Sequence, residues 1–231
     1  MHLKINQKRL YAWYLKERRI LVLSAVFGLL FTVLSAFAAA HYSETVQAGI
    51  AAEVVRFHVL ANSDSPADQA LKLKVRDGIL AEFQPLLTAA QSADETKAAL
   101  GARLGEITAC AERIIKENGA AYPVAARVTK SVFPTKTYGD VVLPAGEYDA
   151  LRVEIGEAVG QNWWCVMFPP LCFVDIAQGK VTEEAKAGLE TILPEEAYDL
   201  VANAATTDNP EIQLKFKIVE WWQELKTAEK K

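Results

Sequence analysis

"VVRFHVLANSDSPADQALKLKVRDGIL", residues 54–80, contains a strand pattern, a polar turn and a helix pattern in one continuous stretch. Residues 54–60 are mostly β-branched or aromatic and end at a cluster of turn formers, which predicts a strand. Ser65 is the expected N-cap of the following helix, because Pro66 suits the first helical position and Asp68 completes a Ser-x-x-Asp capping box. The stretch therefore predicts a strand followed by a helix whose start is strongly specified.

Apolar residues cover more than one side of this helix. They form one stripe of four residues and a second stripe of three leucines: Leu71, Val75, Ile79 and Phe83, then Leu73, Leu80 and Leu87. Such wide coverage indicates burial between a sheet and a second helix. Lys72 and Arg76 lie between the stripes, and Lys72 is placed to pair with Asp68 four residues earlier. The alternative is that part of this face contacts another protein.

The rest of the chain predicts an α+β fold. Residues 92–119 indicate a second helix, with Ser92 as N-cap and Gly119 as the stop. The apolar period then changes to two, and "YDALRVEIG" and "NWWCVMF" predict a hairpin joined by the turn at 156–160. Because helices cluster early and strands lie mid-chain, we expect a mainly antiparallel sheet packed by helices.

Shorter elements are expected towards the end of the sequence. They are a helix capped by Thr182, a short helix after Pro194, a strand through Ile212, Leu214 and Phe216, and a terminal helix bearing Trp221 and Trp222.

The N-terminal 40 residues read as a basic segment followed by a signal peptide or signal anchor. Residues 20–40 carry no charge, and as a helix they would span about 31 Å, enough to cross a hydrocarbon core of about 30 Å. Six cationic residues and one anionic residue precede them, which predicts that everything after residue 40 is exported. Small residues suit cleavage between Ala38 and His41, and an uncleaved membrane anchor is the alternative. Residues 41–50 are expected to be a linker, and residues 51–231 a single ectodomain.

The charge distribution argues against a nucleic-acid partner. The whole chain has a net charge of −4 and residues 1–40 carry +5, so residues 41–231 carry −9. An acidic domain has little long-range attraction for nucleic acid or anionic lipid. Membrane attachment is therefore expected only through the N-terminal helix.

The cysteine and histidine content predicts neither a metal site nor a cofactor. Cys165 and Cys172 flank a Pro-Pro turn, and outside the cytoplasm they are candidates for a disulfide, with Cys110 left unpaired. Two buried thiols are the alternative. The spacing does not match a CxxC redox motif or a paired CxxC zinc set, and only His41 and His58 lie outside the N-terminal flank.

The polar turn after the first strand raises the question of catalysis. His58 with Asp64 would be the general base and partner of an exported hydrolase acting on cell wall or peptide. Capping and turn formation, however, already explain the polar residues here, and the sequence contains no G-x-S-x-G or H-E-x-x-H motif. We therefore predict no catalytic residues.

The candidate surface for binding a partner consists of polar residues from this segment and two tryptophans that must point to opposite faces of a strand. These are Asn62, Asp64, Lys72, Arg76, Trp163 and Trp164.

Three strings, "RFHVLANSDSPADQALKLKVRDGIL", "YDALRVEIGEAVGQNWWCVMFPPLCFVD" and "KFKIVEWW", resemble the stage II sporulation protein R family of spore-forming Firmicutes. The resemblance covers about residues 53–222, and the basic N-terminus and the apolar segment before them also fit that family.

The resemblance implies a signalling protein and not an enzyme. It implies export from the forespore into the space between the forespore and mother-cell membranes. It further implies activation of a membrane-embedded aspartic protease of the mother cell, which removes the pro-sequence of sigma-E. No catalytic residues of this family are available to transfer to the chain. A structural component between the two membranes is a weaker alternative.

Overall fold

The computed structural model describes the chain apart from residues 1–6, 140, 174–180, 182 and 203–231. It divides into two compact units, Met1–Ser43 and Glu44–Lys231. The expected C-terminal strand through Ile212, Leu214 and Phe216 and the helix bearing Trp221 and Trp222 lie outside the described residues.

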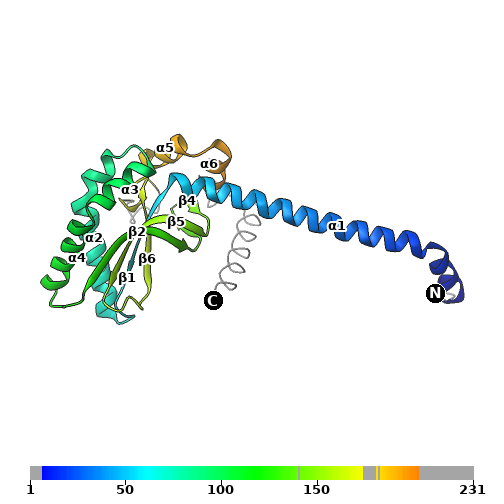
Figure 1. The fold of residues 1–231 in the computed structure, drawn as a ribbon, viewed down its shortest axis with the longest axis horizontal. Helices are drawn as coiled ribbons and strands as arrows, with labels where there is room; N and C mark the ends of the chain where they lie inside the picture. Colours follow the sequence, from blue (N-terminus) through cyan, green and yellow to red (C-terminus); the bar gives the residue numbers. More distant parts are fainter. Residues whose placement is uncertain (1–6, 140, 174–180, 182, 203–231) are drawn as a thin grey trace. The chain divides into compact units, whose positions relative to one another are not determined.

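Helix α1, Gln7–Glu53, makes up the described part of the first unit as far as Ser43 (Figure 1). From Glu44 onward the same helix belongs to the second unit. Over Glu17–Glu53 this helix is long and apolar enough to cross a membrane. None of the 18 residues in its most apolar stretch is buried against the rest of the protein. These properties match those of a signal peptide or membrane anchor.

The second unit is built on a four-stranded sheet in the order β2-β5-β1-β6. The strands are β1 Val55–Leu60, β2 Val124–Phe133, β5 Gly146–Ile155 and β6 Asn162–Phe168. Strand β1 runs parallel to β5 and antiparallel to β6, while β2 runs antiparallel to β5. The predicted α+β class with a mainly antiparallel sheet is confirmed. The predicted hairpin is wrong, because β1 lies between β5 and β6.

Helices α2, α3 and α4 cover the first face of the sheet (Figure 1). Their bounds are Pro66–Ala89, Ala93–Ala102 and Leu104–Glu117. Both predicted N-caps are confirmed, because Ser65 Oγ accepts from Asp68 N at 3.1 Å and Ser92 Oγ accepts from Glu95 N at 3.2 Å. The single helix expected over residues 92–119 is instead two, divided at Arg103, and the low helix propensity of the nearby glycines favours a break there.

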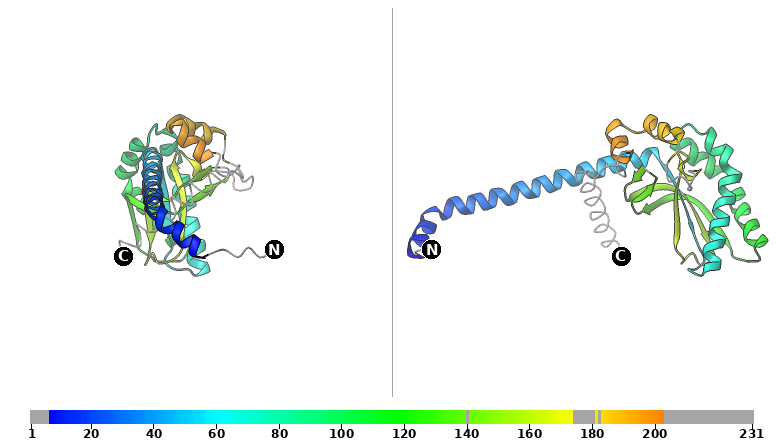
Figure 2. Two further views of the ribbon diagram at one scale, coloured as in Figure 1. Left: turned by 90° about the vertical axis from the view of Figure 1, so that its right-hand side faces the viewer. Right: turned by 180° about the vertical axis from the view of Figure 1, so that it is seen from behind.

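The second face of the sheet carries its own core. It contains residues from the end of α1, the two-stranded hairpin of β3 (Lys136–Tyr138) and β4 (Val141–Leu143), and helices α5 (Glu183–Ile192) and α6 (Glu195–Ala202). Helix α6 packs against β4, as the right-hand view of Figure 2 shows. Residues 41–50, expected as a linker, are helical, and Ile50 and Gln47 are buried in the second unit.

Strand β1 separates the two cores, and all six of its residues are buried. Val55, Phe57 and Val59 belong to the first core. Arg56 and His58 point to the second face, as their alternation predicts. His58 is therefore enclosed by the second core, and it is only 2% exposed.

Helix α2 allows a matched test of the packing. We expect Ile79→Ala to lower the free energy of unfolding by about 2–5 kcal/mol, because Ile79 is fully buried in the first core. Leu73→Ala in the same helix is the control, since Leu73 is 38% exposed, and its effect should stay below about 1 kcal/mol. Urea unfolding followed by circular dichroism measures both. Equal losses for the two variants would contradict this packing.

Candidate partner-binding surface

The polar turn after β1 is held by its own side chains. Asp68 Oδ2 accepts hydrogen bonds from Ser63 Oγ at 2.5 Å and from Asn62 Nδ2 at 2.9 Å. The bond from Ser63, followed by that from Asn62, holds the pKa of Asp68 below its ordinary value. These contacts fix the shape of the turn in front of helix α2.

The same turn interlocks with the loop between β5 and β6. Asn62 Oδ1 accepts from Glu157 N at 3.0 Å, and Asp64 Oδ1 accepts from Gln161 N at 2.6 Å. Gly160 N donates to the carbonyl of Ala61 at 3.0 Å, and a Cβ atom at Gly160 would lie only 2.3 Å from the Ser63 carbonyl oxygen. The glycine is therefore required by the close approach of two backbones.

Lys72 joins helix α2 to the same loop. Its Nζ donates to Gln69 Oε1 at 2.6 Å and to the carbonyl of Gln161 at 2.9 Å. Burial lowers the pKa of Lys72, and nearby Asp64 partly opposes that shift. These contacts replace the predicted pairing of Lys72 with Asp68, whose carboxylate is engaged by the turn.

Arg76 and Trp163 complete the contact between α2 and β6. The Arg76 Cζ atom lies 4.5 Å from the centroid of the Trp163 ring, and Arg76 Nη2 lies 2.6 Å from Asp77 Oδ1. The Trp163 ring meets Phe57 edge-on at 6.1 Å. Five of the six candidate residues thus lie where helix α2 and the turn before it contact strand β6 and the β5–β6 loop: Asn62, Asp64, Lys72, Arg76 and Trp163.

Trp164, the sixth candidate, lies on the opposite face of the sheet. It stacks on His58, with ring centroids 5.1 Å apart and an interplanar angle of 9°, and Phe133 lies 5.2 Å from His58. Neither ring nitrogen of His58 has a hydrogen-bond partner among the described residues. Burial, followed by the charges of Arg152 and Arg56, lowers the pKa of His58 to about 4, so the ring is neutral at pH 7.

His58 and Asp64, the alternative catalytic pair, have separate surroundings. His58 lies among aromatic rings, whereas Asp64 accepts the amide of Gln161 and lies beyond the end of β1. The two residues are close in the sequence, but they share no contact in the structure that would make them a catalytic pair.

Arg56 is a fully buried cation that the sequence analysis did not select. Its Nε donates to the Cys165 carbonyl at 3.1 Å and its Nη2 to Tyr138 Oη at 2.9 Å. Its Cζ lies 4.3 Å from the Phe133 centroid and 4.9 Å from that of Tyr148. Burial raises the pKa of Tyr148 to about 12, with Arg56 opposing the shift, so Tyr148 is neutral in this cluster.

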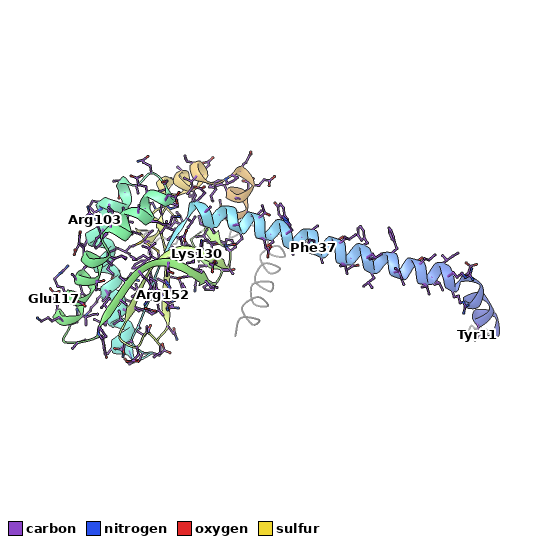
Figure 3. All side chains as sticks on the ribbon, in the orientation of Figure 1. Tyr11, Phe37, Arg103, Glu117, Lys130 and Arg152 are labelled. Atoms are coloured by element: carbon purple, nitrogen blue, oxygen red, sulfur yellow. A yellow bond between two sulfur atoms is a disulfide. The ribbon has the colours of Figure 1, made fainter. Side chains whose placement is uncertain are left out.

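A row of residues across the sheet beside His58 was also not predicted from the sequence as a site. The strand registers align Arg127, Arg152, His58 and Trp164 across β2, β5, β1 and β6. Glu154 accepts from both Arg152 and Arg127. We call Arg127, Arg152, Glu154 and Trp164 the arginine face; Figure 3 labels Arg152 within it. Period-two alternation places Arg152 and Glu154 on one face, but only the register adds Arg127 and Trp164.

The three cysteines differ in state. The structure joins Cys165 and Cys172 in a disulfide, with Cα atoms 5.6 Å apart, and Cys110 is a buried free thiol. Burial raises the pKa of the Cys110 thiol to about 11, which disfavours the reactive thiolate. Among the described residues no group of three or more His, Cys, Asp or Glu side chains could hold a metal ion.

Residues 51–178, which include every candidate residue above, match the family described as Stage II sporulation protein R. The chain belongs to this family. Stage II sporulation protein R of Bacillus subtilis (strain 168) is 36% identical over 196 residues, which cover 80% of this chain and 87% of that protein. No solved structure matches the chain. Family membership links the chain to sporulation.

The buried His58 makes stability depend on pH. Its pKa is about 4 in the folded chain and about 6.5 when unfolded, so the unfolded chain binds the proton more readily between these values. This contribution to stability is complete above pH 6.5 and falls as pH decreases to 4, by about 3 kcal/mol in total.

His58→Phe should retain the ring stacking and lose this part of the pH dependence. Urea unfolding at intervals from pH 7 to pH 4 measures the difference between the two proteins, and carboxylates that titrate in both cancel. Parallel stability curves for wild type and His58→Phe would show that His58 is not buried as a neutral ring.

Proposed function

We propose that this chain is an exported sporulation signal that activates a membrane-embedded aspartic protease of the mother cell. In this proposal the N-terminal helix directs export from the forespore into the space between the two membranes, either as a cleaved signal peptide or as an anchor. The activated protease then removes the pro-sequence of sigma-E. The folded domain is the part that binds the protease.

The family match over residues 51–178 is the observation that carries this proposal, because it covers the folded domain and leaves out the apolar residues 20–40. The side-chain arrangement supports a binding role. The polar turn is engaged in interlocking two loops, which keeps the surface rigid before it meets a partner.

Activation has a simple physical requirement. A ligand shifts a protease towards its active arrangement only if it binds that arrangement better than the inactive one. A rigid domain that contacts more than one part of the protease could meet this requirement by bridging or reorienting protease subunits.

The second candidate function is an exported hydrolase using His58 and Asp64. A general base must reach the proton that it removes, directly or through one water. His58 is 2% exposed between Trp164 and Phe133, and Asp64 is bound to the Gln161 amide, so the arrangement favours the signalling role.

The test is co-reconstitution of the full-length chain with the protease and the sigma-E precursor, followed by immunoblotting of precursor cleavage. We expect cleavage only when the chain is present. His58→Phe should retain most of the activity of a binding protein, whereas loss of a general base would lower hydrolysis at least about a hundredfold. Equal cleavage with and without the chain would refute the proposed function.

A further inference from the structure

The arginine face carries a net positive charge, because it contains two arginines and one glutamate. Glu154 Oε1 lies 2.8 Å from Arg152 Nε and 2.6 Å from Arg152 Nη2, and Glu154 Oε2 accepts from Arg127 Nη2. Two guanidinium groups thus share one carboxylate, and the buried Arg56 occupies the same sheet face one row away. This local excess stands out because residues 41–231 carry a net charge of −9.

We propose that the arginine face binds an acidic segment of the protease, with carboxylate side chains against Arg127 and Arg152 and an apolar side chain against Trp164. This inference rests on the proposed function and names the surface through which the domain would bind the protease. It adds three residues, Arg127, Arg152 and Glu154, to the candidate surface.

The exposed fractions suit a binding surface. The side chains of Arg127 and Arg152 are 54% and 34% exposed, whereas that of Glu154 is 18% exposed. The acid therefore lies deeper and holds the guanidinium groups, whose remaining N–H donors can reach a partner. A guanidinium binds a carboxylate through two parallel hydrogen bonds, and arginine and tryptophan are enriched where interfaces concentrate their binding energy.

Trp164 is fixed before any partner binds. It stacks on His58 at 5.1 Å and meets Phe133 edge-on at 4.7 Å. Because His58 is buried and neutral, it orients the indole without adding charge to the surface. A fixed aromatic side chain loses little conformational entropy on binding.

An open hollow of about 240 Å³ adjoins Glu154 at the edge of this face. Ala125 of β2 and Glu157 and Ala158 of the β5–β6 loop help to line it. The loop is held in place by the polar turn, so the hollow has a defined shape and can receive a side chain of the partner.

Charge favours an acidic protein segment over other anionic partners. The net charge of −9 on residues 41–231 opposes long-range attraction to nucleic acid and to anionic lipid surfaces. A short acidic peptide segment carries few charges and contacts only the local cationic site, so the net negative charge of the domain opposes it less than it opposes an extended anionic surface.

The experiment compares two charge-reversed full-length chains in the same cleavage assay. Arg127→Glu with Arg152→Glu should lower activation at least about tenfold, because each reversal replaces an attraction by a repulsion. The control, Lys74→Glu with Arg113→Glu, changes net charge equally on the helical side, where these residues contact Asn118 and Glu82. It should activate like wild type.

A milder pair, Arg127→Gln with Arg152→Gln, guards against misfolding of the charge-reversed chain. It should lose activation while keeping the melting temperature of wild type. If wild type activates the protease and the Gln pair activates equally well, the inference is wrong and the proposed function stands. If wild type itself fails to activate, the proposed function is wrong.

Reconstitution in two kinds of vesicle distinguishes a lipid partner. The defect of the Gln pair should be the same in zwitterionic vesicles and in vesicles containing anionic lipid, as expected for contact with the protease. A defect confined to anionic vesicles would show that the arginine face binds lipid headgroups, and would overturn the inference.

Discussion

Burial of strand β1 on both faces is the constraint on which the rest of the domain depends. The strand pairs with β5 on one side and β6 on the other, and all six of its residues are buried. Burying the Arg56 cation costs several kcal/mol unless its donors are satisfied. The Cys165 carbonyl, the Tyr138 hydroxyl and three aromatic rings offset part of that cost, while Arg56 Nη1 has no hydrogen-bond partner among the described residues. The second core is therefore organised around a charge as much as around apolar side chains.

The same strand positions the surface proposed for binding. Its odd-numbered residues pack under helix α2, which places Arg76 over Trp163. His58, on the other face, orients Trp164 and lies beside Arg152. The turn that follows β1 supplies Asn62 and Asp64 to the β5–β6 loop. Residues that resemble a catalytic cluster in the sequence thus act in the structure as supports for two loops and two tryptophans.

Local features of the fold could be predicted from the sequence. The N-caps at Ser65 and Ser92 depend on residues three positions apart, and alternation placed Trp163 and Trp164 on opposite faces. The insertion of β1 between β5 and β6 could not be predicted, because adjacent strands with a turn favour a hairpin and the parallel β1–β5 pairing joins residues more than 90 positions apart. The arginine face was missed for the same reason: its members come together only through strand register.

Hydrogen–deuterium exchange of the purified chain tests the central position of β1 most directly. The amides of Phe57 and Val59 should exchange only through global unfolding, with a free energy equal to that measured by urea, because β1 has a neighbouring strand on each side and a core on each face. Amides of the edge strand β2 should exchange through smaller openings. Exchange of the β1 amides at a free energy well below that of global unfolding would contradict the account.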